Sequence, residues 1–218
     1  MKIQLTQKHL AFIIVAISFI YLISCQKEAS WVTSAKIIYT DIIPDTIVVS
    51  YGTYNLDLDK DGVYDFSFEC DDGQSRCGGD QFPTYADWAY VAVKPAENSF
   101  NEVLNVVDSV FLDSSPAALD SLTKISSIND NWAFDFYRAL KYYKYCRNGF
   151  TDVYEFGNWP NSIDKYLGLK LVKGTQAFYG WVRLNVQISF PINGAILILK
   201  DYAYNSSPNE SILAGQKE

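Results

Sequence analysis

The residues best suited to chemistry are four aspartates in one short loop. They stand at loop positions 1, 3, 5 and 9, and a glycine at position 6 permits a sharp turn. Calcium takes six to eight oxygen ligands, and this spacing curls alternate side chains towards one point. The backbone carbonyl at loop position 7 would add another oxygen. The predicted calcium ligands are Asp57, Asp59, Asp61, the carbonyl of Val63, and Asp65.

The loop lacks one mark of an EF-hand, which needs a bidentate glutamate at position 12, where this chain has Phe68. It resembles instead the calcium hairpins of integrin-type propeller repeats, D-x-D-x-D-G-x-x-D, in which the loop joins two strands. The alternative is an acidic, solvated turn that binds no specific ion. Four carboxylates repel one another without a cation, which favours calcium. Lys60 is the only basic residue inside the loop.

The flanking sequence predicts that the loop joins two half-buried strands. Apolar and polar residues alternate in Tyr54–Leu58 and again in Tyr64–Cys70, as in an antiparallel pair with one buried face. A second hairpin is predicted from Leu167–Val172 to Ala177–Val186. Its parity places Gly168 opposite Trp181, where a glycine would leave room for the indole to lie across the neighbouring strand.

Short strand-like runs separated by turn residues continue along the chain. The chain is 49% hydrophobic and 16% aromatic, and aromatic residues favour strands. At 218 residues, it suits one domain. We therefore expect an all-β fold, an antiparallel β-sandwich forming a single domain over residues 36–216. One short helix is expected at 116–125, and a long surface loop at 146–164.

The N-terminal residues resemble the signal of a bacterial lipoprotein. The apolar run Leu10–Ile23 would rise about 21 Å as a helix, which is short of the ~30 Å bilayer core but typical of a signal peptide. It ends in Leu22-Ile23-Ser24-Cys25, which resembles a lipobox. The resemblance implies cleavage after residue 24 and attachment of lipid, including palmitate, to Cys25. A plain secretory signal with a coincidental cysteine is the alternative.

The lipobox also implies a location. Residues 1–24 would be the signal peptide, and residues 25–35 the lipidated cysteine with a tether. Gln26-Lys27-Glu28 resembles the export tag that follows the lipidated cysteine in surface lipoproteins of Bacteroidota. We expect a protein anchored in the outer membrane of a Gram-negative bacterium and exposed on the cell surface. The periplasmic face remains the alternative.

Composition disfavours several functional classes. The chain has 18 basic and 25 acidic side chains, and the basic ones do not cluster, which disfavours nucleic-acid binding. Its one histidine, His9, falls in the predicted signal peptide. The mature chain would therefore have no Ser-His-Asp triad and no histidine-ligated metal. We expect a protein that is not an enzyme; the alternative is a glycan hydrolase using carboxylates such as Asp152 and Glu155.

Three cysteines remain after Cys25, and an exported protein favours one disulfide among them. The residues between Cys70 and Cys77 are typical of a turn, so this pair is predicted. Pairings of either residue with Cys146 stay open.

Some aromatic residues could contact a ligand, with a glycan the most plausible and a surface protein the alternative, although packing inside the domain is the favoured interpretation for most of them. One face of the second predicted hairpin would carry a row of aromatic and basic side chains, and a further tryptophan falls in the predicted loop at 146–164. Such side chains stack on sugar rings, or else pack inside the domain. The candidate stacking residues are Tyr166, Tyr179, Trp181, Arg183 and Trp159.

A wider resemblance spans residues 41–215. The chain combines the D-x-D-x-D-G-x-x-D-F loop with a C-terminal block, Tyr179-Gly180-Trp181, then Asp201-Tyr202-Ala203-Tyr204, then Ala214-Gly215. It is similar to a family of exported bacterial β-proteins without established function, many of which end in a sorting segment. This chain departs from the family in lacking that segment, and the lipid at Cys25 would replace it as the anchor.

Overall fold

The computed structural model describes residues 36–77, 84–107, 114–134, 138–147, 151–189 and 194–218, which belong to one compact unit. The predicted signal peptide, the lipidation site at Cys25 and the tether lie outside the described residues. Within the part of the chain that the structure describes there are strands and no helix.

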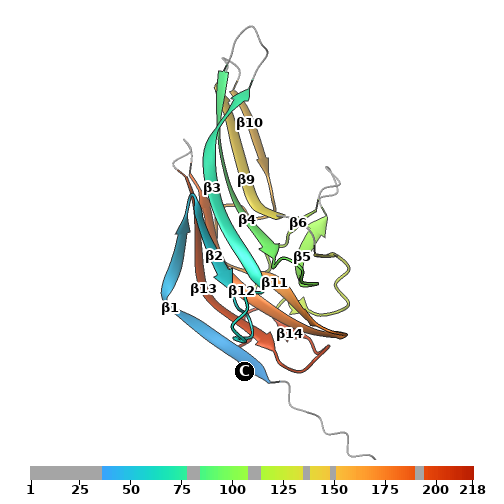
Figure 1. The fold of residues 1–218 in the computed structure, drawn as a ribbon. Coiled ribbons are helices and arrows are strands. Elements are labelled where there is room, and N and C mark those ends of the chain that lie inside the picture. The colour runs from blue at the N-terminus through green and yellow to red at the C-terminus, as the bar shows by residue number, and fades with distance from the viewer. Residues whose placement is uncertain (1–35, 78–83, 108–113, 135–137, 148–150, 190–193) are drawn as a thin grey trace, which may run out of the picture. The chain divides into compact units, whose positions relative to one another are not determined.

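Three antiparallel sheets make up the fold (Figure 1). The seven-stranded sheet has the order β1 (Ile37–Val49), β13 (Ala195–Asn205), β12 (Gln176–Ile188), β11 (Ser162–Lys173), β5 (Glu102–Val107) and β6 (Ser114–Pro116), with β8 (Trp132–Ala133) also paired to β5. The five-stranded sheet has the order β10 (Thr151–Phe156), β9 (Arg138–Arg147), β4 (Thr84–Pro95), β3 (Phe66–Cys77) and β2 (Gly52–Leu56). The third sheet pairs β14 (Ile212–Leu213) with β7 (Lys124–Ile125). The prediction of an all-β antiparallel sandwich is confirmed.

The principal core lies between the two larger sheets. Alternate residues of β3 and β4 face alternate residues of β11, β12 and β13, so each sheet buries one apolar face. Phe66 and Phe68 are fully buried on one side, and Leu169 and Leu184 on the other. A second, smaller core covers the opposite face of β12 and includes Trp181. Strands β12 and β13 are therefore buried on both faces over part of their length.

Both predicted hairpins form, and the second has the register that its parity predicted. Tyr54 pairs with Phe68 and Leu56 with Phe66 in the β2–β3 hairpin. In the β11–β12 hairpin, Gly168 pairs with Trp181 as the parity required. The room above Gly168, however, is not filled by the indole. A Cβ atom at this glycine would lie 2.9 Å from the Cβ atom of Leu104, because β5 packs closely against β11 there.

Two segments differ from the predicted secondary structure. The helix expected at 116–125 is wrong, because Pro116 ends β6 and Lys124–Ile125 forms β7, which pairs with β14. The surface loop expected at 146–164 is also wrong, because β10 occupies residues 151–156 and β11 begins at Ser162. Pairing with strands that are distant in the sequence gives the backbone of these segments its hydrogen bonds, although their own residues do not clearly favour a strand.

The predicted Cys70–Cys77 disulfide is wrong. Both residues lie on the continuous strand β3, seven positions apart, and at about 3.3 Å per residue their Cα atoms are roughly 23 Å apart. A disulfide needs Cα atoms within about 7 Å. Cys70 faces the principal core, where burial raises the pKa of its thiol to about 12 and keeps it protonated. The turn-like residues between the two cysteines instead pair in register with β4.

The close approach of β5 to β11 gives a test of the fold. We expect Gly168→Ala to lower the free energy of unfolding by about 1–3 kcal/mol, since the new methyl group would overlap Leu104 in a packed interior. Urea denaturation measures the change. Thr175→Ala, on the exposed β11–β12 turn, serves as the control and should change stability little. Equal midpoints for the two variants would contradict the packing described above.

Candidate functional site

The acidic loop joins β2 to β3, and its own backbone amides bind its carboxylates. Asp57 Oδ2 accepts a hydrogen bond of 2.8 Å from the Gly62 N–H, and Asp57 Oδ1 accepts one of 3.2 Å from the Asp61 N–H. Gly62 has φ of +93°, the conformation that its loop position required. Asp61 Oδ1 in turn accepts a bond of 2.9 Å from the N–H of Val63. Backbone hydrogen bonds to the carboxylates of Asp57 and Asp61 therefore support the conformation of the turn.

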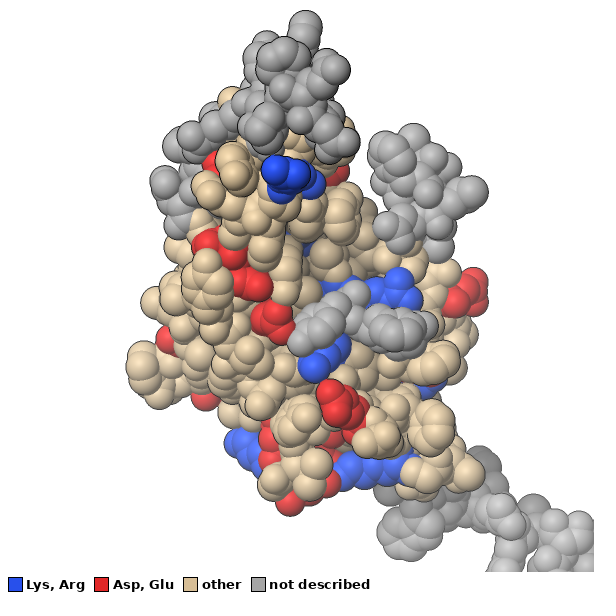
Figure 2. All heavy atoms as spheres, turned by 45° about the horizontal axis from the view of Figure 1, so that its top comes forward, with Lys and Arg blue, Asp and Glu red and all other residues tan. Residues whose placement is uncertain are grey.

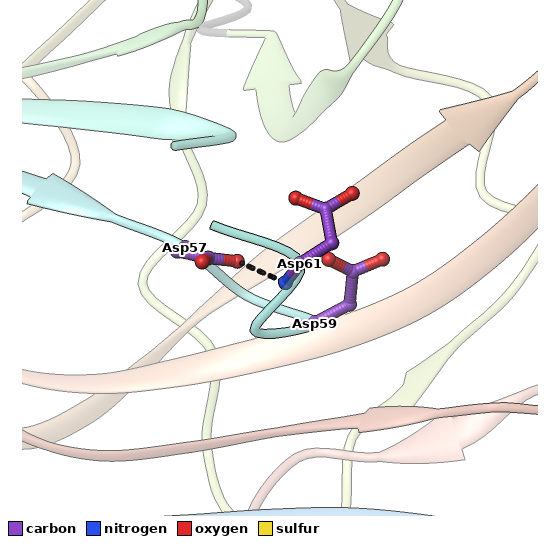
Figure 3. Close-up of side chains that lie close together, drawn as sticks. All are labelled: Asp57, Asp59 and Asp61. Carbon is purple, nitrogen blue, oxygen red and sulfur yellow. Dashed lines mark hydrogen bonds between the residues drawn. The ribbon is translucent and has the colours of Figure 1, made fainter. Parts of the chain in front are cut away.

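Three of the predicted ligands come together. One carboxylate oxygen from each of Asp57, Asp59 and Asp61 lies within 4.8 Å of the others. Figure 3 shows the Asp59 and Asp61 side chains side by side and pointing the same way, with Asp57 across the turn. Oxygen ligands at this spacing suit a hard cation, although the geometry does not select calcium over others.

Asp65 does not join this cluster. It is buried, and its Oδ2 atom accepts a hydrogen bond of 2.8 Å from the N–H of Leu58. Its Oδ1 atom accepts a longer bond, 3.4 Å, from the side-chain amide of Asn101. Burial raises the pKa of Asp65 to about 6, although the Leu58 N–H opposes the shift. Asp65 thus supports the loop from its buried side, which the D-x-D-x-D-G-x-x-D pattern alone could not distinguish from a ligand role.

A lysine from the other sheet reaches the cluster. Lys173, at the end of β11, places Nζ 2.7 Å from Asp61 Oδ2 and also pairs with Asp59 Oδ2. The two carboxylates raise the pKa of Lys173, and the hydrogen bond from Lys173 lowers the pKa of Asp61. The sequence did not predict a role for Lys173, because this residue is 112 positions from Asp61. No pattern within either turn indicates that turns from two different sheets meet in the fold.

One acceptor in the cluster has no partner among the described residues. The Asp59 side chain is only 9% exposed, and its Oδ1 atom is buried without a hydrogen bond. A buried carboxylate oxygen that lacks a partner costs free energy, because it has lost its bonds to water. A cation that reached Asp59 Oδ1 would satisfy this atom.

The predicted stacking face on β12 is buried. Trp181 and Tyr179 lie in the second core, beneath β7 and β14. The indole of Trp181 donates a hydrogen bond of 3.2 Å to the carbonyl of Gln216, and Tyr166 packs edge-on against it with ring centroids 5.3 Å apart. These rings pack within the domain, as the favoured interpretation expected, and the alternative role of the buried Tyr179 and Trp181 in stacking on a sugar is wrong.

Arg183 is likewise a structural residue. Its guanidinium binds the buried carboxylate of Asp201 through two bonds, Nε to Oδ1 at 2.8 Å and Nη2 to Oδ2 at 2.9 Å. Tyr39 donates a further bond of 3.0 Å to Oδ2, and Lys217 one of 3.1 Å. The carboxylate is therefore fully surrounded by donors, and Arg183 is not held ready for a ligand.

Two other candidates are also engaged. Trp159 is completely buried in the principal core, and its indole N–H donates a bond of 3.0 Å to the carbonyl of Pro116, so its prediction as an exposed stacking residue is wrong. Asp152 and Glu155 lie on strand β10. The carboxylate of Glu155 is 3.0 Å from Nζ of the buried Lys141.

The charged surface is mixed. On the face drawn in Figure 2, blue and red side chains are interspersed over a mostly uncharged surface, without a broad basic area. A duplex or single strand of nucleic acid would need such an area. In the described residues, no helix has both the length and the apolar character needed to cross a membrane.

Comparison with models of known protein families, with curated proteins and with solved structures finds no significant match.

The Asp201 network can be tested directly. We expect Arg183→Met to lower the free energy of unfolding by up to about 3 kcal/mol, because it leaves a buried carboxylate without its main partner. Urea denaturation measures the loss. Arg76→Met, at an exposed position of β3, should change stability by less than about 0.5 kcal/mol. Similar losses in the two variants would show that the network contributes little.

Proposed function

We propose that this chain is a lipid-anchored envelope protein of a Gram-negative bacterium, exposed at the cell surface, whose β-sandwich is a calcium-stabilised binding or structural module. The anchor is supported by the positively charged start, the short apolar run and the lipobox-like sequence ending at Cys25. Attachment there would leave the folded domain outside the membrane, joined to it by about ten residues of tether.

The observation that carries the calcium proposal is the cluster of three carboxylates at the β2–β3 loop. Asp57, Asp59 and Asp61 supply oxygens within 4.8 Å of one another, and the buried Asp59 Oδ1 lacks a partner among the described residues. The Val63 carbonyl and water would complete the shell. A bound calcium ion would neutralise the charges that oppose closure of the loop.

Calcium would have to compete with Lys173 for two of these carboxylates. The ammonium group neutralises part of the charge of the cluster, because it pairs with both Asp59 and Asp61. The competing interpretation is that Lys173 is the counter-ion of Asp59 and Asp61 and that the loop binds no metal. The first interpretation predicts that calcium stabilises the domain, and the second predicts that calcium has no effect on its stability.

The proposed role is binding or assembly rather than catalysis. The mature chain has no histidine, which removes the commonest general base. A carboxylate-based glycan hydrolase is less well supported, because Glu155 is held by Lys141. A glycan or a surface protein is the proposed partner.

Thermal unfolding with and without calcium tests the site. For an extracellular-type dissociation constant on the order of 10⁻⁴ M, millimolar calcium would add about 1.4 kcal/mol of stability, which raises Tm by about 2–6 °C. Asp61→Asn should abolish this shift. Asp45→Asn, an exposed aspartate outside the loop, is the matched control and should keep it. Magnesium should substitute poorly, because it demands a tight octahedron.

A second variant separates calcium from lysine. Lys173→Met should lower Tm in chelator, because three carboxylates then lie together without a cation, and should enlarge the shift on adding calcium. If both the wild type and Lys173→Met unfold identically with calcium and with chelator, the loop is an acidic turn held by Lys173 alone.

Substitution of Cys25 tests the anchor. We expect Cys25→Ala to remove acyl labelling and to release the protein from the membrane fraction. Stable anchoring needs more than one acyl chain, and the substitution would remove the cysteine that carries them. Metabolic labelling with a palmitate analogue and membrane fractionation measure both effects. Cys77→Ala is the matched control and should remain labelled. Unchanged labelling of the Cys25 variant would refute the lipobox interpretation.

A further inference from the structure

The outer face of the five-stranded sheet carries two aromatic rings that belong to neither core. Trp88 and Tyr90 lie on β4 and are partly exposed, and they alternate with Ala89 and Val91, which face the principal core. The two rings are nearly parallel, with an interplanar angle of 9° and centroids 5.9 Å apart. We call this pair of residues the tryptophan platform.

The indole of Trp88 lies flat against the sheet. Trp88 pairs with Gly73 of β3, and a Cβ atom at this glycine would lie 2.7, 3.1 and 3.3 Å from the indole atoms Cζ2, Cε2 and Cη2. Three similar distances indicate that the Cβ would meet the face of the ring, because an approach to the ring edge would separate neighbouring atoms more. One face of the indole therefore rests on β3, and the other points away from the sheet. The parallel ring of Tyr90 lies flat as well.

Trp88 differs from the other tryptophans that the structure describes. The indole N–H groups of Trp132, Trp159 and Trp181 each donate to a backbone carbonyl, at 3.0–3.3 Å. The indole N–H of Trp88 has no partner among the described residues. A hydrogen-bond donor and one face of the ring are therefore both available to a ligand at this position.

Polar side chains flank the tryptophan platform on both sides. Asp71 of β3 pairs with Tyr90, and Lys144 of β9 pairs with Trp88, so all four share the outer face of the sheet. Lys144 is partly exposed, and its Nζ atom bonds to no residue that the structure describes. Glu69 accepts a bond of 2.5 Å from the Tyr90 hydroxyl, which fixes the orientation of that ring. The platform thus has acceptors on its β3 side and a donor on its β9 side.

A hollow of about 360 Å³ adjoins the platform. Tyr90 forms part of its wall, together with Tyr142, Phe156, Arg138 and two serines. Small-molecule sites span roughly 300–1,000 Å³, so the hollow can accept one ring of a ligand while a neighbouring ring lies on Trp88.

The mixture of charges around the platform limits the ligand. Glu69 and Asp71 would repel an anion, while Lys144 and Arg138 would repel an organic cation. A hydroxyl group suits such surroundings, because it accepts from a lysine or an indole and donates to a carboxylate. A neutral ligand with many hydroxyl groups and apolar ring faces therefore matches both the flat rings and the charges beside them.

We propose that the tryptophan platform binds a neutral saccharide, whose ring stacks on the free faces of Trp88 and Tyr90 and whose hydroxyl groups bond to the flanking side chains. The inference rests on the proposed binding role of the domain, and it assigns the ligand to the five-stranded sheet rather than to the aromatic face of β12. An aromatic ring over a glycine also stabilises a sheet, so a purely structural role for Trp88 is the competing outcome of the test.

Ligand-observed NMR on the full-length protein in a zwitterionic detergent tests the proposal. The neutral probes are cellotriose, maltotriose and xylotriose, with protonated glucosamine trimer as the cationic counterpart and trigalacturonic acid as the anionic one. We expect saturation transfer to at least one neutral probe and to neither charged one. Trp88→Leu should weaken binding about tenfold, which equals about 1.4 kcal/mol, because it removes the flat ring. Tyr85→Leu, an exposed aromatic residue on the opposite face of β4, is the matched control and should bind as the wild type does.

A second variant decides the proposal if Trp88→Leu does not fold. Lys144→Met leaves both rings in place and removes a donor, so it should weaken binding about threefold without lowering Tm. Loss of affinity in the variant that decides supports the proposal. Binding to none of the neutral probes at about 10 mM, undiminished binding in that variant, or equal binding of a charged probe would overturn it and leave Trp88 as the cover of Gly73. The calcium shift and the acylation of Cys25 are separate measurements, so the anchored module can stand without this ligand.

Discussion

Strand β12 must be buried on both of its faces, and much of the architecture follows from that requirement. Val182 and Leu184 face the core between the two larger sheets, while Tyr179 and Trp181 face the other way. A large aromatic side chain buries 150–250 Å², and at about 25 cal/mol per Å² its exposure would be costly. The small sheet of β7 and β14 provides the cover, and the Gln216 carbonyl accepts the indole N–H.

Parity along the strands was enough to predict the sandwich, the presence of two hairpins and the register of one of them. Gly168 could be placed opposite Trp181 because one misplaced residue would turn every side chain to the wrong face. What covered Trp181 could not be predicted, since the covering strands come from remote segments. The same limit explains the Cys70–Cys77 error: the intervening residues have turn propensity, but pairing with β4 extends them as a strand.

The acidic loop shows a similar division between local and long-range information. Its spacing predicted that Asp57, Asp59 and Asp61 would converge, because those positions follow from a tight turn. The burial of Asp65 and the arrival of Lys173 depend on how two sheets pack, and no pattern in the loop reports either. Lys173 changes the electrostatics of the loop, since the cluster carries its own counter-charge.

The pairing of β1 with β13 joins the beginning of the domain to its end. Ile37 lies opposite Asn205, and the two positions are 168 residues apart in the chain (205 minus 37). Until β13 is in place β1 has no partner, and its unpaired edge is a place where aggregation can begin. A chain with this connectivity can complete its largest sheet only by bringing its two ends together, and contacts between residues so far apart in the sequence make folding slow.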